Sequence, residues 1–177
     1  AREKLIEIIR ESVPHGKYHL ERDFLLPEYN EGRLKIHVYP FHNVVMFNDS
    51  TLEYYRNSMR LLDEEVRHGL YRSEVPIYTK VRDAVPTLYG ENGRTPNCLV
   101  ADGCHLFGYA ENSIIFREVE IEEGAEVRDC VVMQGSKIGV GASIQYAILD
   151  KNVTIRPGVR LLGAPDHPLI INKGAIV

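Results

Sequence analysis

A five-residue pattern in the C-terminal part of the chain places the strongest constraint on its fold. Between residues 100 and 177 an aliphatic residue, two variable residues, a glycine and a small residue return five times. The middle three copies lie 17 residues apart, the first precedes them by 21 residues and the last follows after 16. The leading aliphatic residues are Val100, Ile121, Ile138, Ile155 and Ile171. A repeat this short and regular indicates a solenoid.

The pattern favours β-structure over helix. Helix-pair repeats are about 33 residues or longer, and a glycine inside each helix would cost about 1 kcal/mol. Seventeen residues divide into three short strands, one for each side of a triangular coil, so we expect a left-handed parallel β-helix of hexapeptide repeats. The leading aliphatics should point inward, and the repeated glycines should form corners that need a positive φ. These turn glycines are Gly103, Gly124, Gly141, Gly158 and Gly174.

Bulk properties exclude several classes of partner. The 177 residues carry a net charge of −4 without a run of basic residues, so neither nucleic acid nor an anionic membrane is expected as a partner. No apolar run approaches the roughly 20 residues that a membrane-spanning helix needs. The three cysteines, Cys98, Cys104 and Cys130, show no metal-site or disulfide spacing. We therefore expect free thiols and a cytoplasmic protein.

The N-terminal third has mixed character. Residues 2–12 have the apolar spacing of an amphipathic helix, and residues 34–38 alternate as a strand does, with a second short strand expected at 44–47. A helix should start at the Ser50–Glu53 capping box and run to about Arg67. Another strand is expected at 76–81.

These elements suggest three segments: an α/β remnant over 1–67, a linker with an irregular first coil over 68–97, and the β-helix over 98–177. The chain begins with Ala1 rather than Met, which suggests a piece of a longer protein. The alternative for the first segment is a small helical cap on the solenoid.

Specific stretches resemble one enzyme family. Residues 148–155, 112–116 and 131–133 resemble the C-terminal β-helix of bacterial glucose-1-phosphate adenylyltransferase (ADP-glucose pyrophosphorylase), and residues 23–62 resemble the end of its nucleotidyltransferase domain. The resemblance covers most of the chain and implies a place in glycogen biosynthesis. It also implies Mg²⁺ with ATP in the catalytic members of the family, although no cofactor and no metal site is expected in this fragment.

The chain departs from the catalytic pattern at one position. Counting back from Leu62 places Phe47 where the family has a metal-holding Asp, and only a two-residue slip would place Asp49 there. The chain also contains no Trp, and the family's Gly-rich nucleotide loop is absent. The resemblance therefore points to the non-catalytic, regulatory type of subunit, which would pair with a catalytic subunit or self-associate. We expect this chain to be inactive alone, with no catalytic residue, and Asp49 to act as a helix cap.

Regulation by sugar phosphates, which the resemblance implies, would require cations on the coils. The candidates are Lys151, Arg156, Arg160 and Lys173, for which the alternative is a solvated surface role.

Two other functions stay open. The first is a hexapeptide-repeat acyltransferase with His105 as a general base, although the structural role is favoured for His105 and a surface-loop role for His167. The second is that the chain is part of an active sugar-phosphate nucleotidyltransferase.

Overall fold

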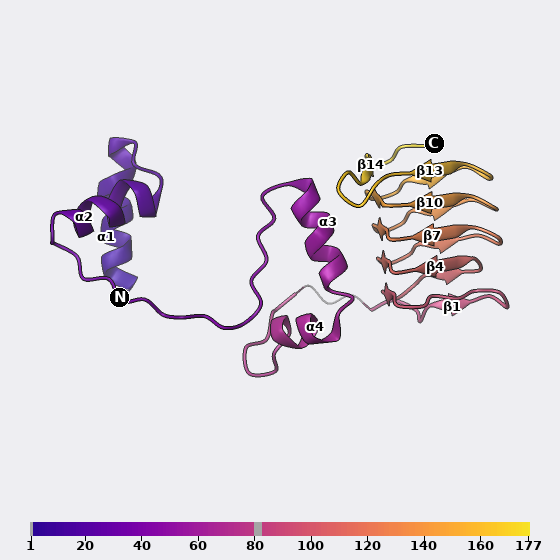
Figure 1. Cartoon of the computed structure of the whole chain (residues 1–177), viewed down its shortest axis with the longest axis horizontal. Helices are drawn as coiled ribbons and strands as arrows, with labels where there is room; N and C mark the ends of the chain where they lie inside the picture. Colours follow the sequence, from indigo (N-terminus) through magenta and orange to yellow (C-terminus); the bar gives the residue numbers. More distant parts are fainter. Residues whose placement is uncertain (1, 80–82) are drawn as a thin grey trace. The chain divides into compact units, whose positions relative to one another are not determined.

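The computed structural model describes residues 2–79 and 83–177, which form two compact units, Ala1–His42 and Asn43–Val177 (Figure 1). Each unit is described by itself. The segment boundaries 1–67, 68–97 and 98–177, which the sequence pattern suggests, stay a prediction. Part of the strand expected at 76–81 lies outside the described residues, and its described part, 76–79, is not a strand.

The first unit is helical. The helix α1 (Arg2–Ser12) confirms the amphipathic pattern and leads into a 3₁₀ turn, Val13–His15. A π-helical segment, Leu20–Leu25, then continues into α2 (Leu26–Asn30). None of this unit's described side chains is buried. It therefore lacks a hydrophobic core of its own.

The strands expected at 34–38 and 44–47 are not formed. Backbone amides of Arg33 and Leu34 bond back to Glu28, at 2.9 and 3.2 Å, but no described strand pairs with the residues that follow. Val38 is 87% exposed. The sequence of this segment does alternate between apolar and polar residues. A β-strand, however, also needs a neighbouring strand that forms hydrogen bonds with its backbone, and no strand in the described chain pairs with this segment.

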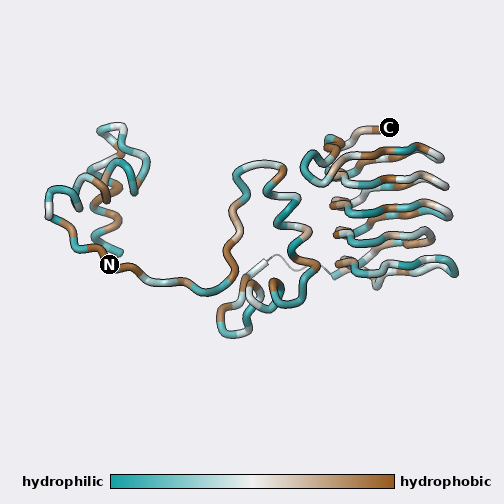
Figure 2. The backbone as a smooth tube through the Cα atoms, in the orientation of Figure 1, coloured by the Kyte–Doolittle hydropathy of each residue, from teal (hydrophilic) through white to brown (hydrophobic). Residues whose placement is uncertain are grey.

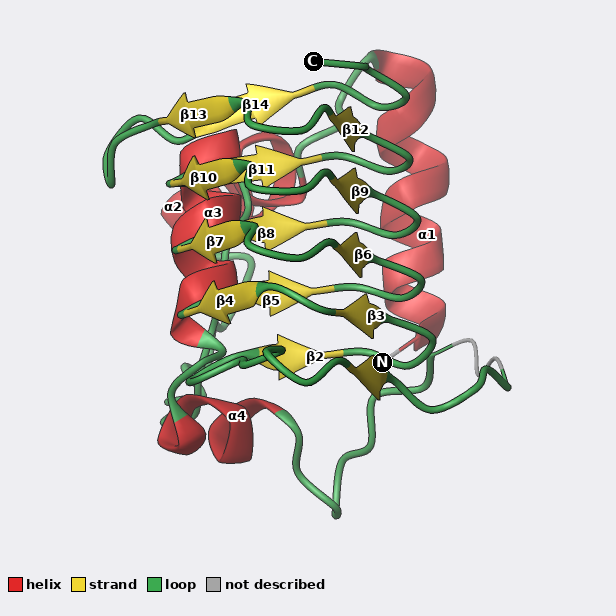
Figure 3. Ribbon diagram, turned by 90° about the vertical axis from the view of Figure 1, so that its right-hand side faces the viewer, coloured by secondary structure: helices red, strands yellow, loops and turns green. Residues whose placement is uncertain are grey.

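The second unit is a parallel β-solenoid with three sheets (Figure 3). Sheet A comprises β1 (Leu88–Tyr89), β3 (His105–Leu106), β6 (Glu120–Ile121), β9 (Lys137–Ile138) and β12 (Thr154–Ile155). Sheet B comprises β4 (Tyr109–Glu111), β7 (Glu126–Arg128), β10 (Ser143–Gln145) and β13 (Arg160–Leu162). Sheet C comprises β2 (Leu99–Val100), β5 (Ile114–Ile115), β8 (Val131–Val132), β11 (Ala147–Leu149) and β14 (Leu169–Ile171). This confirms the parallel β-helix; its left-handed winding stays a prediction.

The repeat sets the register of the sheets. Ile121 pairs with Ile138, and Ile138 pairs with Ile155, so the 17-residue step is one turn of the coil. These three side chains are at most 1% exposed. Apolar and polar residues alternate along the coils in Figure 2, because successive strand residues point to opposite faces of a sheet. The inward residues of all three sheets form one core.

The five glycine steps occupy two different corners of the prism. Gly124, Gly141 and Gly158 lie between sheets A and B, at the A–B corner, where the Gly158 amide donates to the Val140 carbonyl at 2.9 Å. Gly103 and Gly174 lie between sheets C and A, at the C–A corner. All five have positive φ, from 66° to 75°. The uneven spacings of 21 and 16 residues arise because the outer two copies belong to another side of the triangle.

Helix α3 (Thr51–Arg60) covers part of sheet C. The Ser50 hydroxyl accepts the Glu53 amide at 3.1 Å, so Ser50, rather than Asp49, caps this helix. Tyr55, 5% exposed, packs against Val131 and Ile148, which point outward from β8 and β11. The outer face of sheet C is apolar here, and the helix removes it from water.

The helix expected to reach Arg67 is broken into two. Helix α3 ends at Arg60, and the carboxylate of Asp63 accepts the amide of Glu65 at 2.8 Å to start α4 (Glu64–Leu70). The apolar spacing continues across the break and therefore does not reveal it. Aspartate is a preferred N-cap residue, so Asp63 is the sequence feature that indicates a second helix start, which the apolar spacing alone does not show.

Candidate functional site

The four predicted effector-binding residues lie on the last coils of the solenoid, in two pairs. Lys151 and Lys173 follow β11 and β14 at the C–A corner, on consecutive coils, and the Gly174 amide donates to the Lys151 carbonyl at 3.0 Å. Neighbouring strands in a sheet lie about 4.8 Å apart, so the two ammonium groups can reach one ligand. Both side chains are exposed.

Arg156 and Arg160 form the second pair, at the A–B corner. Arg156 follows β12, and Arg160 opens β13, with Gly158 between them at φ +72°. Both are exposed, and among the described residues neither pairs with a carboxylate. Strand β12 separates this pair from the two lysines. The structure thus divides the predicted set into two cationic positions rather than gathering it into one.

The region that the family resemblance aligns with the metal-holding Asp is used for packing around α3. The Asn57 side-chain amide donates to the Phe47 carbonyl at 2.6 Å and to the Asn48 side chain at 3.1 Å. The Phe47 side chain is 70% exposed, and Asp49 precedes the helix cap. Within 2–79 and 83–177 no cluster of three or more His, Cys, Asp or Glu side chains is positioned to hold a metal.

The two histidines that the sequence singles out, His105 as a possible general base and His167 as a surface-loop residue, lie in different settings. His105 is exposed on the outer face of β3, between Leu88 and Glu120 in sheet A. His167 is in a tight turn where its amide and carbonyl bond to Ala164, at 3.0 and 3.1 Å. His105 thus stands on a short strand of the solenoid rather than in an extended loop.

The three cysteines are free thiols, as predicted. Cys104 and Cys130 point into the solenoid core and are fully buried, whereas Cys98 is partly exposed. Burial raises the pKa of the Cys130 thiol to about 12. A thiol that stays protonated is a poor nucleophile, so Cys130 is a core residue.

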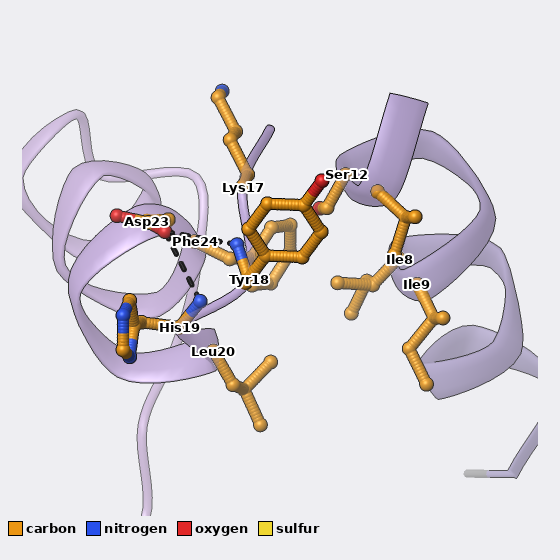
Figure 4. Close-up of a pocket in the computed structure, with 10 residues that line it drawn as sticks. Ile8, Ile9, Ser12, Lys17, Tyr18, His19, Leu20, Asp23 and Phe24 are labelled. Atoms are coloured by element: carbon orange, nitrogen blue, oxygen red, sulfur yellow. Dashed lines mark hydrogen bonds between the residues drawn. The ribbon is translucent and has the colours of Figure 1, made fainter. Parts of the chain in front are cut away.

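The first unit contains a small pocket of about 170 Å³ (Figure 4). Its lining residues are Ile8, Ile9, Ser12, Val13, Lys17, Tyr18, His19, Leu20, Asp23 and Phe24. The carboxylate of Asp23 accepts the amides of Tyr18 at 3.1 Å and His19 at 3.0 Å. Arg22 donates to the same carboxylate at 2.8 Å, and these bonds lower the pKa of Asp23 to about 2. Asp23 thus fixes the turn between the helices, and Lys17 is the one lysine or arginine that lines the pocket.

A second, polar hollow lies on the solenoid and was missed by sequence reasoning. It runs along the A–B corner and sheet B, lined by Gly124, Glu126, Gly141, Ala142, Ser143 and Arg160. The 17-residue step would have placed Glu126, Ser143 and Arg160 in one column, because they are direct partners in β7, β10 and β13. The sequence feature that predicts this hollow is the series of charged and polar residues spaced 17 apart, not the repeated glycines.

The part of the chain that the structure describes contains no helix long and apolar enough to cross a bilayer.

Comparisons with known proteins agree with this architecture. Residues 83–166 match the family model described as GlmU-like, C-terminal hexapeptide. The chain is 35% identical over 149 residues to the glycogen biosynthesis protein GlgD of Bacillus subtilis, which covers 84% of this chain and 43% of that protein. It is 37% identical over 120 residues to GlgD of Geobacillus stearothermophilus, covering 68% of this chain and 35% of that protein.

A third relative carries an enzyme name. The chain is 34% identical over 130 residues to glucose-1-phosphate adenylyltransferase of Corynebacterium jeikeium, covering 70% of this chain and 32% of that enzyme. The chain therefore spans less than half the length of these curated relatives. Its hexapeptide solenoid and its similarity to the C-terminal regions of these proteins show that it belongs to the glucose-1-phosphate adenylyltransferase and GlgD family.

Proposed function

We propose that this chain is a regulatory and assembly module of glycogen biosynthesis, acting with a catalytic glucose-1-phosphate adenylyltransferase subunit in the cytoplasm rather than as an enzyme alone. One observation carries the proposal: the segment that the family resemblance aligns with the catalytic carboxylate instead packs around the start of α3, with Phe47 at the matching position. Phosphoryl transfer needs a metal-holding carboxylate and a cradle for phosphates. The similarity to GlgD, whose name is glycogen biosynthesis protein, supports the part of the proposal that places the chain in glycogen biosynthesis.

The effector sites in this proposal are the two cationic positions on the last coils. An anionic sugar phosphate would accept charge-assisted hydrogen bonds from Lys151 and Lys173, or from Arg156 and Arg160. Each pair is exposed and free of carboxylate partners in the described chain, so a phosphate would not first have to displace an ion pair. Mg²⁺ with ATP would be bound by the catalytic subunit, not by this chain.

The direct test combines this chain with a catalytic glucose-1-phosphate adenylyltransferase from the same organism, using glucose 1-phosphate and ATP. We expect no ADP-glucose from the chain alone and a changed rate, or a changed response to hexose phosphates, when the two are mixed. Turnover by the chain alone would contradict the proposal and favour an active nucleotidyltransferase. Saturable binding of acetyl-CoA would favour the acyltransferase alternative instead.

Two double variants locate the effector site. One variant combines Lys151→Ala with Lys173→Ala, and the other combines Arg156→Ala with Arg160→Ala. Each is titrated with hexose phosphates by calorimetry. We expect one of the two to weaken binding about tenfold or more, because hydrogen bonds to a charged group contribute about 1.5–3 kcal/mol each. Lys137→Ala, on sheet A, is the matched control. Binding that neither double variant changes would remove both cationic positions from the proposal.

A further inference from the structure

Charge is segregated along the solenoid axis at the A–B corner. In sheet B, Glu126, Ser143 and Arg160 are direct partners on three successive coils. On the other side of the same corner, Glu122, Gly139 and Arg156 follow β6, β9 and β12 with the same 17-residue step. Along the solenoid axis, each column therefore has an acidic residue, then a small neutral residue, then a basic residue.

These charges are largely uncompensated within the described chain. Glu122, Arg156 and Arg160 have no ion-pair partner there, and Glu126 is 3.6 Å from Arg128. Arg128 in turn pairs with Glu111 and lies over the Tyr109 ring, 4.9 Å from its centroid. Arg128 is thus neutralised locally and does not disturb the acid-to-base order of the two columns.

Between the two charged rows, the A–B corner of the middle coil (residues 139–143) carries no charge and offers an apolar contact. Val140 is 54% exposed there, between Gly139 and Gly141. Ser143 follows on sheet B and lines the polar hollow between Glu126 and Arg160. Helix α3 packs on sheet C, and at the A–B corner Val140, Arg156 and Arg160 stay exposed within the described residues.

We propose that this face binds a second copy of the same chain, with the two solenoids antiparallel and a two-fold axis passing beside Val140. A two-fold interface brings residue i against residue j, and j against i. Rotation about this uncharged corner sets Glu122 against the partner copy's Arg156, and Glu126 against its Arg160, each twice. Val140 then meets its own counterpart at the axis.

The charge order selects this arrangement over its alternatives. Two solenoids placed side by side in parallel would set glutamates against glutamates and arginines against arginines, which is repulsive. The contact is narrow and its charges are solvent-exposed, so the association should be weak and should fall with ionic strength.

This proposal goes beyond the proposed regulatory function, although both use Arg156 and Arg160. Sugar phosphates are therefore left out of its test. The 177-residue chain is studied by sedimentation equilibrium at low and high sodium chloride. We expect a monomer–dimer equilibrium that shifts to monomer in high salt. A chain that stays monomeric at millimolar concentration in low salt would overturn the proposal.

Charge reversal gives the decisive measurement. The variant Arg156→Glu with Arg160→Glu, and the variant Glu122→Arg with Glu126→Arg, should each dimerise about tenfold or more weakly, since attraction becomes repulsion at every pair. Mixed together, the all-acidic and the all-basic face are complementary at every position, so a heterodimer should form. Reversed variants that dimerise as the parent does, or that fail to combine, would contradict the antiparallel contact.

The geometry has its own test that does not depend on charge. Val140→Cys should form an intermolecular disulfide under mild oxidation, because the axis places the two Cβ atoms near each other. Lys137→Cys, exposed on sheet A, is the matched control and should remain unlinked, as should the parent chain. Equal cross-linking at both positions would contradict an axis beside Val140. Circular dichroism confirms that each variant is folded.

Discussion

The hydroxyl of Tyr55 donates a hydrogen bond to the backbone carbonyl of Asp129 across 2.7 Å and joins α3 to the solenoid. Asp129 is at a corner with φ 51°, where its carbonyl leaves the strand ladder. The ring of Tyr55 packs on Val131 and Ile148 beside this bond. One side chain therefore supplies both the apolar contact and the polar anchor of the helix.

Tyr55→Phe should lower the free energy of unfolding by about 1–2 kcal/mol, because it leaves the Asp129 carbonyl without its partner while keeping the ring. Urea denaturation followed by circular dichroism measures the change. Tyr54→Phe is the matched control, because Tyr54 packs at the same contact without a comparable bond. An equal loss in both variants would mean that the hydroxyl of Tyr55 adds nothing.

Stability should also fall at high pH through Tyr55. Burial, the first cause, raises the pKa of its phenol. The unfolded chain therefore releases this proton first, near pH 10, while the folded chain still holds it. The stability that the protonated Tyr55 phenol contributes to the folded chain is therefore complete below that pH and is lost as the pH rises above it. The parent should lose stability more steeply than Tyr55→Phe between pH 9 and about pH 11; parallel curves would contradict this.

Two glycines should respond differently to the same substitutions. Gly158 has φ +72° and a Cβ there would meet open space, so Gly158→Ala should cost about 1–2 kcal/mol and Gly158→Asn less. At Gly139 a Cβ would lie 2.6 Å from the Pro157 nitrogen, so both substitutions should cost about 1–3 kcal/mol. Thermal unfolding tests the contrast. If asparagine were better tolerated than alanine at Gly139 as well, backbone conformation and not crowding would be the cause.

The cysteines should react in a fixed order with a thiol reagent. Cys98 is partly exposed, whereas Cys104 and Cys130 are fully buried. We expect one thiol to react in the folded chain, slowly because burial raises its pKa, and all three in guanidinium. Cys98→Ser should abolish the reaction of the folded chain. Rapid reaction of Cys130 without unfolding would show that the solenoid core opens.

Hydrogen exchange should separate residues 35–48 from the solenoid. The amides of this segment have no backbone partner in the described chain, whereas the Gly139 amide donates to the Ile155 carbonyl at 2.9 Å. Exchange measured by mass spectrometry should be complete within seconds at 35–48 and far slower across β6, β9 and β12. Strong protection at 35–48 would indicate that these residues pair as the strand their sequence predicts.

The solenoid could be predicted from sequence because its information is local and repeated. Ile121, Ile138 and Ile155 each specify the same inward position, and each following glycine specifies a corner, so many weak signals agree on one register. The strand expected at 34–38 failed for the opposite reason. Its alternation describes a half-buried surface, but whether a strand forms depends on a backbone partner that no local pattern supplies.

The coil period, the buried column of isoleucines and the family resemblance could all be read from residue types at fixed spacing. The folded chain was needed to show that Gly103 and Gly174 turn a different corner from the other three glycines, and that the four cations separate into two pairs. It was also needed to show that Glu126, Ser143 and Arg160, which the 17-residue step aligns, line a polar hollow. Positions a whole turn apart become neighbours only when the coil closes, and the corner at which each residue falls depends on where the first coil begins.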